Sequence, residues 1–142
     1  MKTYQKAALS LLLCAFVAIP QAALAGKPGK PAPSDCDFQN YDPAPACNTK
    51  LMTAYSELET NRASFVSKRS DQNYFGLRCK VVSALNKMVQ DKPVDAEKNL
   101  ADSVFKIATL YQKGKIDDAQ AATDMQDAME AARACAEAEI YK

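Results

Sequence analysis

The longest helical pattern in the chain is DAQAATDMQDAMEAARACAEAEI, which covers residues 118–140. Its apolar residues recur every three or four positions, as on the inner face of an α-helix. That face consists of Ala121 or Ala122, Met125, Ala128, Met129, Ala132 and Ala136. Alanine lets helices approach closely but buries little apolar area, and burial contributes roughly 25 cal/mol per Å². The pattern therefore predicts a closely packed helix beside a thin core.

Three other helical patterns precede this one. They run from Asn48 or Thr49 to about Arg69, from Ser70 or Asp71 to Asp91, and from a cap at Asp95 to a stop at Gly114. The expected inner face of the first pattern consists of Leu51, Tyr55, Leu58 and Phe65. That of the second consists of Phe75, Cys79, Val82, Leu85, Met88 and Val89. That of the third consists of Leu100, Val104, Ile107 and Leu110 or Tyr111. No stretch alternates with period two, as a half-buried strand does. The sequence thus predicts an all-α fold, a three- or four-helix antiparallel bundle over residues 48–142.

Residues 26–47 have a different composition. The first nine, GKPGKPAPS, hold three of the seven prolines and two of the four glycines. Such a segment cannot bury apolar surface and is expected to be extended. We therefore predict an N-terminal extended arm that becomes ordered only where Cys36, Phe38, Tyr41 and Cys47 dock on the bundle.

Residues 1–25 have the three-part pattern of a cleavable secretory signal. It consists of a basic start with Lys2 and Lys6, an apolar run from Ala7 to Ile19, a break at Pro20, and small residues at Ala23 and Ala25. The apolar run is shorter than the ~20 residues of a permanent membrane anchor. We expect cleavage after Ala25 and export to the periplasm of a Gram-negative cell.

Two further features bear on export and on partners. Cys14 could be the lipid acceptor of a lipoprotein, although Leu13 stands where a lipobox has a small residue. Loss of Lys2 and Lys6 with the signal changes the formal charge from +1 to −1. A near-neutral chain lacks the basic excess of nucleic-acid binders and of polybasic membrane-surface proteins. The sequence thus favours a protein partner in the cell envelope, with no nucleic acid and no membrane span.

Cleavage also leaves an even number of cysteines, namely Cys36, Cys47, Cys79 and Cys135. In an exported chain of this size they predict two disulfides. With a ~1.5 Å rise per residue, Cys79 lies about 12 Å and Cys135 about 27 Å from the same end of the bundle. This mismatch favours Cys47 with Cys135 and Cys36 with Cys79. The pairing of Cys36 with Cys47 and Cys79 with Cys135 stays open, because Gly76 leaves the start of the second helix uncertain.

The sequence offers few groups for catalysis. It contains no histidine, which is the commonest general base near pH 7 and the commonest transition-metal ligand. If the four cysteines are paired, no thiolate nucleophile remains among them. Glycine-based nucleophile or phosphate motifs are absent, and the acidic residues of the last helix match no calcium loop. We therefore predict no catalytic residue, no cofactor and no metal.

Arg62 and Arg78 are the most unusual charged residues, because each lies beside an apolar stripe. They could converge on an anionic ligand, as an arginine-based all-α enzyme would require. The alternative is that each extends its head to water or pairs with an acid such as Glu59. The spacing of Arg69 and Lys80 is similar to part of the pattern of exported chorismate mutases. The acid and the Arg-Glu pair that complete that pattern are absent after Lys80.

A non-enzymatic exported protein that binds another macromolecule fits these observations best, for example an immunity, inhibitor or envelope adaptor protein. The candidate binding surface consists of Phe38, Tyr41, Arg62, Arg78 and Tyr141, since interfaces favour aromatic residues and arginine. The aromatic rings could instead only cover helix ends. A second hypothesis is a small-molecule or lipid carrier. It requires a cavity between helices beside Ala128 and Ala132, lined by Met125 and Met129.

Overall fold

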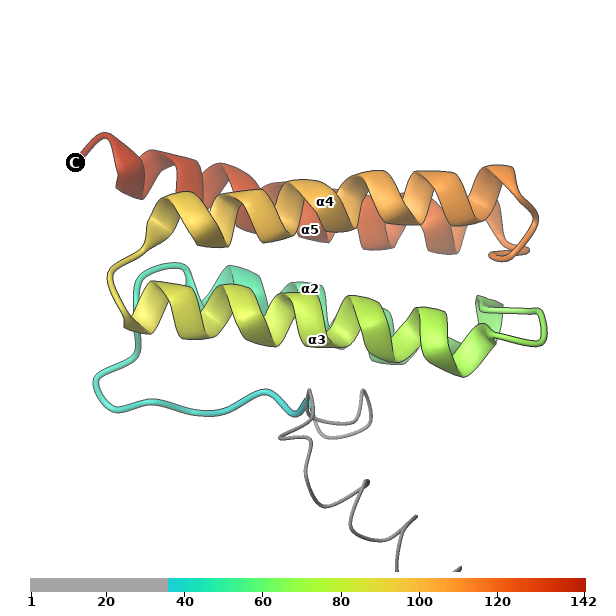
Figure 1. The fold of residues 1–142 in the computed structure, drawn as a ribbon, viewed down its shortest axis with the longest axis horizontal. Helices are drawn as coiled ribbons and strands as arrows, with labels where there is room; N and C mark the ends of the chain where they lie inside the picture. The colour runs from blue at the N-terminus through green and yellow to red at the C-terminus, as the bar shows by residue number, and fades with distance from the viewer. Residues whose placement is uncertain (1–35) are drawn as a thin grey trace, which may run out of the picture. The chain divides into compact units, whose positions relative to one another are not determined.

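The computed structural model of the protein describes residues 36–142. This part of the chain contains α2 (Asn48–Thr60), the 3-10 turn η2 (Arg62–Ser64), α3 (Ser70–Val89), α4 (Pro93–Gln112) and α5 (Ala119–Ile140). The four α-helices run alternately in opposite directions (Figure 1). Each packs on its neighbour in the chain, and α5 also packs on α2. The predicted all-α antiparallel bundle is confirmed, with four helices.

Two expectations lie wholly or partly outside the described residues. The secretory signal at 1–25 and the first part of the arm, 26–35, belong to the segment that the structure leaves undescribed. From Cys36 to Cys47 the arm is non-helical, and it packs on the core through the four predicted residues Cys36, Phe38, Tyr41 and Cys47. Within residues 36–142, none of the helices combines the length and hydropathy that a membrane crossing requires.

The first helix ends earlier than predicted, at Thr60 rather than near Arg69. Asn61 closes it, because its backbone N–H and its side-chain Nδ2 both donate to the carbonyl of Glu57. The chain then turns through η2 and becomes extended at Phe65, which forms an isolated antiparallel bridge with Ile116. This bridge joins the loop before α3 to the loop after α4. Phe65 therefore enters the core from a loop and not from a helix.

The other helix boundaries follow the predicted local signals closely. Asp118 caps α5, and its Oδ1 accepts a hydrogen bond from the backbone of Ala121 at 3.0 Å. Helix α4 begins at Pro93, two residues before the predicted cap, and Asp95 lies in its first turn. Gly114 follows the end of α4 with a φ of 68°, a conformation that glycine adopts without strain. Helix α3 continues through Gly76 without a break.

The alanine-rich face of α5 is buried as predicted. Ala121, Ala122, Met125, Met129, Ala132 and Ala136 are buried, and Ala128 is half-buried. On α3 the buried stripe differs from the prediction: Tyr74, Leu77 and Val81 lie inside, whereas Val89 is exposed. The reason is that α3 packs on both α2 and α4, so its buried stripe is wide. On α4, Leu110 lies inside and Tyr111 is exposed.

Ala132→Leu is expected to lower the free energy of unfolding by about 2 kcal/mol, because a fully buried alanine leaves no room for a larger side chain. Urea unfolding followed by circular dichroism would measure the loss. Ala131→Leu is the matched control, since Ala131 is exposed on the same helix. If the two variants were equally stable, there would be unfilled volume beside α5.

Candidate functional site

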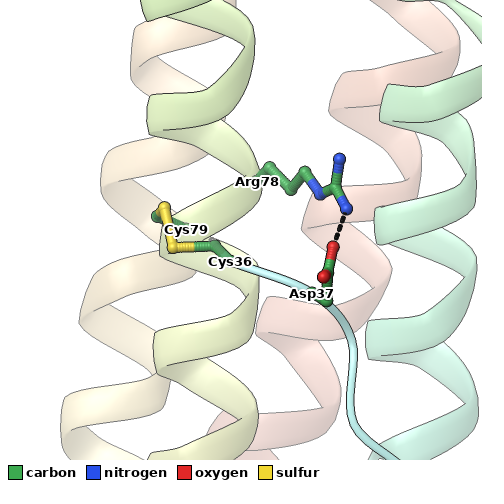
Figure 2. The surroundings of a disulfide bond; sticks show 4 residues. All are labelled: Cys36, Asp37, Arg78 and Cys79. Carbon is green, nitrogen blue, oxygen red and sulfur yellow. Dashed lines mark hydrogen bonds and ion pairs between the residues drawn. A yellow bond between two sulfur atoms is a disulfide. The ribbon is translucent and has the colours of Figure 1, made fainter. Parts of the chain in front are cut away.

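Two disulfides fasten the arm and close the bundle. Cys36 is bonded to Cys79, with Cα atoms 5.0 Å apart, and Cys47 to Cys135, with Cα atoms 5.8 Å apart. This is the favoured pairing, and the alternative pairing is wrong. The first bond joins the arm to the middle of α3 (Figure 2). The second joins the start of α2 to α5, so the first and last helices of the bundle are held together.

Arg78 forms a second tie beside the Cys36–Cys79 disulfide. Its guanidinium pairs with Asp37, the residue that follows Cys36 in the arm (Figure 2). The Arg78 side chain is only 14% exposed, and its guanidinium lies 4.9 Å from the ring centre of Tyr55. Burial by itself lowers the pKa of Arg78, but Tyr55, Tyr74 and Asp37 outweigh it, so the pKa stays above its ordinary value. Arg78 is thus a charged residue that fastens the arm.

Arg62 occupies a neighbouring position. Its guanidinium lies 4.7 Å from the ring centre of Tyr74 and 4.9 Å from that of Phe75, and it pairs with Asp71 at 3.5 Å. The guanidinium of Arg78 is 5.7 Å from the same Phe75 ring. The arginines thus come close together, but each faces an aspartate, and neither forms an ion pair with the predicted partner, Glu59.

A hollow of about 450 Å³ lies beside Arg62 but does not include Arg78. It is lined by Glu59, Thr60, Arg62, Ala63, Phe65, Ser70, Asp71 and Tyr74. An arginine-based enzyme requires both arginines and an acid in one cleft. The arrangement of Arg62 and Arg78 gives that hypothesis no support.

The predicted aromatic anchors are divided between the core and the surface. Phe38 packs against Tyr55 with ring centres 5.6 Å apart. Tyr41 is half-buried, and its hydroxyl donates to Oδ1 of Asn86 at 2.6 Å. Phe38 and Tyr41 therefore help to dock the arm. Tyr141 is 82% exposed and directly follows the end of α5.

Arg133 organises a charged cluster between α4 and α5. It forms ion pairs with Glu97 at 3.0 Å, Glu130 at 2.6 Å and Glu137 at 3.1 Å. The hydrogen bonds from Arg133 lower the pKa of Glu130. The acids of α5 are thus partly neutralised within the fold. Among residues 36–142, no group of three or more Asp, Glu or Cys side chains is placed so that it could hold a metal ion.

The α5 residues that the carrier hypothesis placed beside a cavity are buried or half-buried in the core. Met125, Met129 and Ala132 are fully buried. The hollows at the surface of α3 and α4 are lined by other residues. The carrier hypothesis therefore finds no support at the place where it predicted a cavity.

The sequence did not single out the surface formed by α3 and α4. A hollow of about 400 Å³ lies there, lined by Gly76, Leu77, Lys80, Asp102, Ser103, Phe105, Lys106 and Thr109. Phe105 is 74% exposed, although it borders this hollow. The available signal was that Phe105 falls outside the apolar stripe of Leu100 and Ile107. A large aromatic residue outside the stripe has to face water or a partner.

A second hollow, of about 320 Å³, adjoins the first. It lies at the start of α3, the end of α4 and the loop that follows α4. It is lined by Arg69, Gln72, Asn73, Lys106, Thr109, Leu110, Lys113 and Lys115, with no acidic residue among them. Lys106 and Thr109 line both hollows. We call the two hollows together the α3–α4 surface, and we call the second one the basic hollow.

The α3–α4 surface is the candidate functional site because its main groups are not used within the fold. Arg78 and Arg133 have ion-pair partners within the protein, whereas Phe105 is open to solvent. Comparison of the chain with protein-family models, with curated proteins and with solved structures found no match.

Proposed function

We propose that the protein is a non-enzymatic exported protein that binds another protein through the α3–α4 surface. The observation that carries this proposal is Phe105, a phenylalanine 74% exposed at the edge of an open hollow. Protein interfaces are enriched in aromatic residues, and a few such anchors supply most of the binding free energy. An exposed anchor beside a hollow is the arrangement that a partner side chain can complete.

Gly76 supports the same site. In a helix interior, glycine is about 1 kcal/mol less favourable than alanine. A Cβ atom added at Gly76 would meet nothing within 4 Å, so packing within the bundle does not require glycine there. The missing side chain keeps the hollow beside Phe105 open. A partner can use that space.

The covalent framework agrees with export and with a binding role. Intramolecular disulfides form and persist in oxidising compartments, which fits the secretory pattern of residues 1–25 and a periplasmic location. Cross-links from α5 to α2 and from α3 to the arm also fix the frame that carries the surface. Preorganisation lowers the entropic cost of association. Immunity proteins, inhibitors and envelope adaptors are the classes that this arrangement suits.

Site-specific photo-cross-linking would test the proposal in cells that export the full-length chain. A benzoylphenylalanine in place of Phe105 is expected to capture one discrete protein. The matched control is the same residue in place of Val94, which is 58% exposed near the start of the same helix. No adduct from position 105, or the same adducts from both positions, would contradict the proposal.

The captured protein allows a quantitative test. Phe105→Ala is expected to weaken its affinity at least tenfold, or about 1.4 kcal/mol. Val94→Ala should leave the affinity unchanged. Both variants should unfold within about 0.5 kcal/mol of the wild type, since both side chains are exposed. Calorimetry on the purified pair measures the affinities.

A further inference from the structure

The basic hollow contains cations that have no partner in the fold. Among residues 36–142, Arg69, Lys106, Lys113 and Lys115 form no ion pair with a carboxylate. Asp71, two residues after Arg69, pairs with Arg62, and Asp102, which lines the other hollow, pairs with Lys80 at 3.6 Å. Four uncompensated charges around one hollow attract anionic groups.

Asn73 also lines the basic hollow. Its Nδ2 atom is buried and has no hydrogen-bond partner among the described residues. A ligand in the hollow reaches that atom only if the side chain of Asn73 rotates, so the inference rests on the four cations. Cations without partners favour a ligand that carries negative charge.

The two hollows of the α3–α4 surface form one site. Lys106 and Thr109 line both hollows, and Phe105 precedes Lys106 in α4. On the basis of the proposed function, we infer that the protein partner presents an acidic segment. An apolar side chain of this segment lies against Phe105 and Gly76, and its carboxylates lie over the basic hollow. Phe105 and Lys113 are about 12 Å apart along α4. An extended peptide covers that distance in about four residues.

The observations favour a peptide over a membrane. An amphipathic membrane-binding surface has a broad apolar face, whereas this apolar hollow is bordered by one exposed aromatic ring and by the Lys80–Asp102 ion pair. Basic clusters that attach to lipids lie beside a membrane-spanning helix or along one amphipathic helix, whereas Arg69, Lys106 and Lys115 come from three different segments of the chain.

Fluorescence anisotropy with two labelled octapeptides would test the inference on the oxidised, exported protein. One peptide carries leucine and phenylalanine followed by six glutamates, and its counterpart carries six glutamines. The glutamate peptide is expected to bind at least tenfold more tightly. Lys106→Glu combined with Lys113→Glu should weaken its binding at least tenfold. Lys50→Glu combined with Lys98→Glu is the charge-matched control, because both lysines are exposed and lie outside the two hollows, and it should have little effect.

Three results would overturn the acidic segment. The first is equal binding of the two peptides. The second is binding of inorganic phosphate or of phosphatidylglycerol vesicles that the paired lysine variant abolishes, while neither peptide binds. The third is a partner, captured through position 105, whose affinity is unchanged by the paired variant, in which case protein binding stands. Failure to capture any protein through position 105 would instead contradict the proposed function.

Discussion

Replacement of both Cys47 and Cys135 by serine is expected to lower the free energy of unfolding by about 4.5 kcal/mol. The bond joins residues 88 apart in the sequence, and closing a loop of that length removes much entropy from the unfolded chain. Domains of this size are stable by only about 5–15 kcal/mol. The α5 core face is mostly alanine, which supplies little buried area per residue. The serine variant should therefore be close to unfolded at 37 °C.

Urea unfolding followed by the helical circular dichroism signal would measure this loss, and replacement of Cys36 and Cys79 by serine is the matched control. That bond encloses a shorter segment, 43 residues, and it fastens a non-helical arm to α3. Without it the arm can detach while the four helices stay packed, so the helical signal should change less. Equal losses in the two variants would show that the Cys47–Cys135 bond has no special role in holding α2 to α5.

The disulfide pairing was predictable because helix geometry fixes heights along a bundle. Cys79 and Cys135 were expected at different heights, about 12 Å and 27 Å, since each residue adds ~1.5 Å along its helix. The uncertain start of the second helix at Gly76 had kept the other pairing open. The early end of α2 did not disturb this result, because Cys47 stays at the start of that helix. The end itself was not predictable from periodicity. After Asn61 the chain turns, and Phe65 pairs with Ile116, a contact between two loops that are distant in the sequence.

The candidate site was less accessible to sequence reasoning. Arg69 precedes α3, Lys106 lies in α4 and Lys115 lies in the loop before α5, so only tertiary packing brings them to one hollow. Their immediate sequence neighbours, such as Phe105 and Ile107 on either side of Lys106, do not mark them as a group. Phe105 did carry a local signal, since it departs from the apolar spacing of α4. Phe38 and Tyr41 were also predicted to belong to a binding surface, and the structure shows that they pack against the core and dock the arm.

Arg78→Ala is expected to lower the free energy of unfolding by about 3 kcal/mol. The side chain is 14% exposed, and its stem and guanidinium lie between the arm and the rings of Tyr55 and Phe75. Burial of each CH₂ group contributes about 0.8 kcal/mol, and the cation–π contacts add about 0.5–1 kcal/mol. Truncation removes both contributions. Loss of the ion pair adds little, because Asp37 is 73% exposed and remains hydrated without its partner.

Two further variants separate packing from charge at this position. Arg78→Met keeps most of the stem and removes the charge, so it should cost about 1 kcal/mol, while Asp37→Asn should cost less than about 0.5 kcal/mol. Urea unfolding at low and high salt would rank the three variants by their loss of free energy of unfolding. A loss from Asp37→Asn as large as that from Arg78→Ala would mean that the ion pair, and not the aromatic contacts, fastens the arm. If packing dominates, added salt should leave the ranking unchanged, because screening weakens exposed ion pairs and not buried stacking.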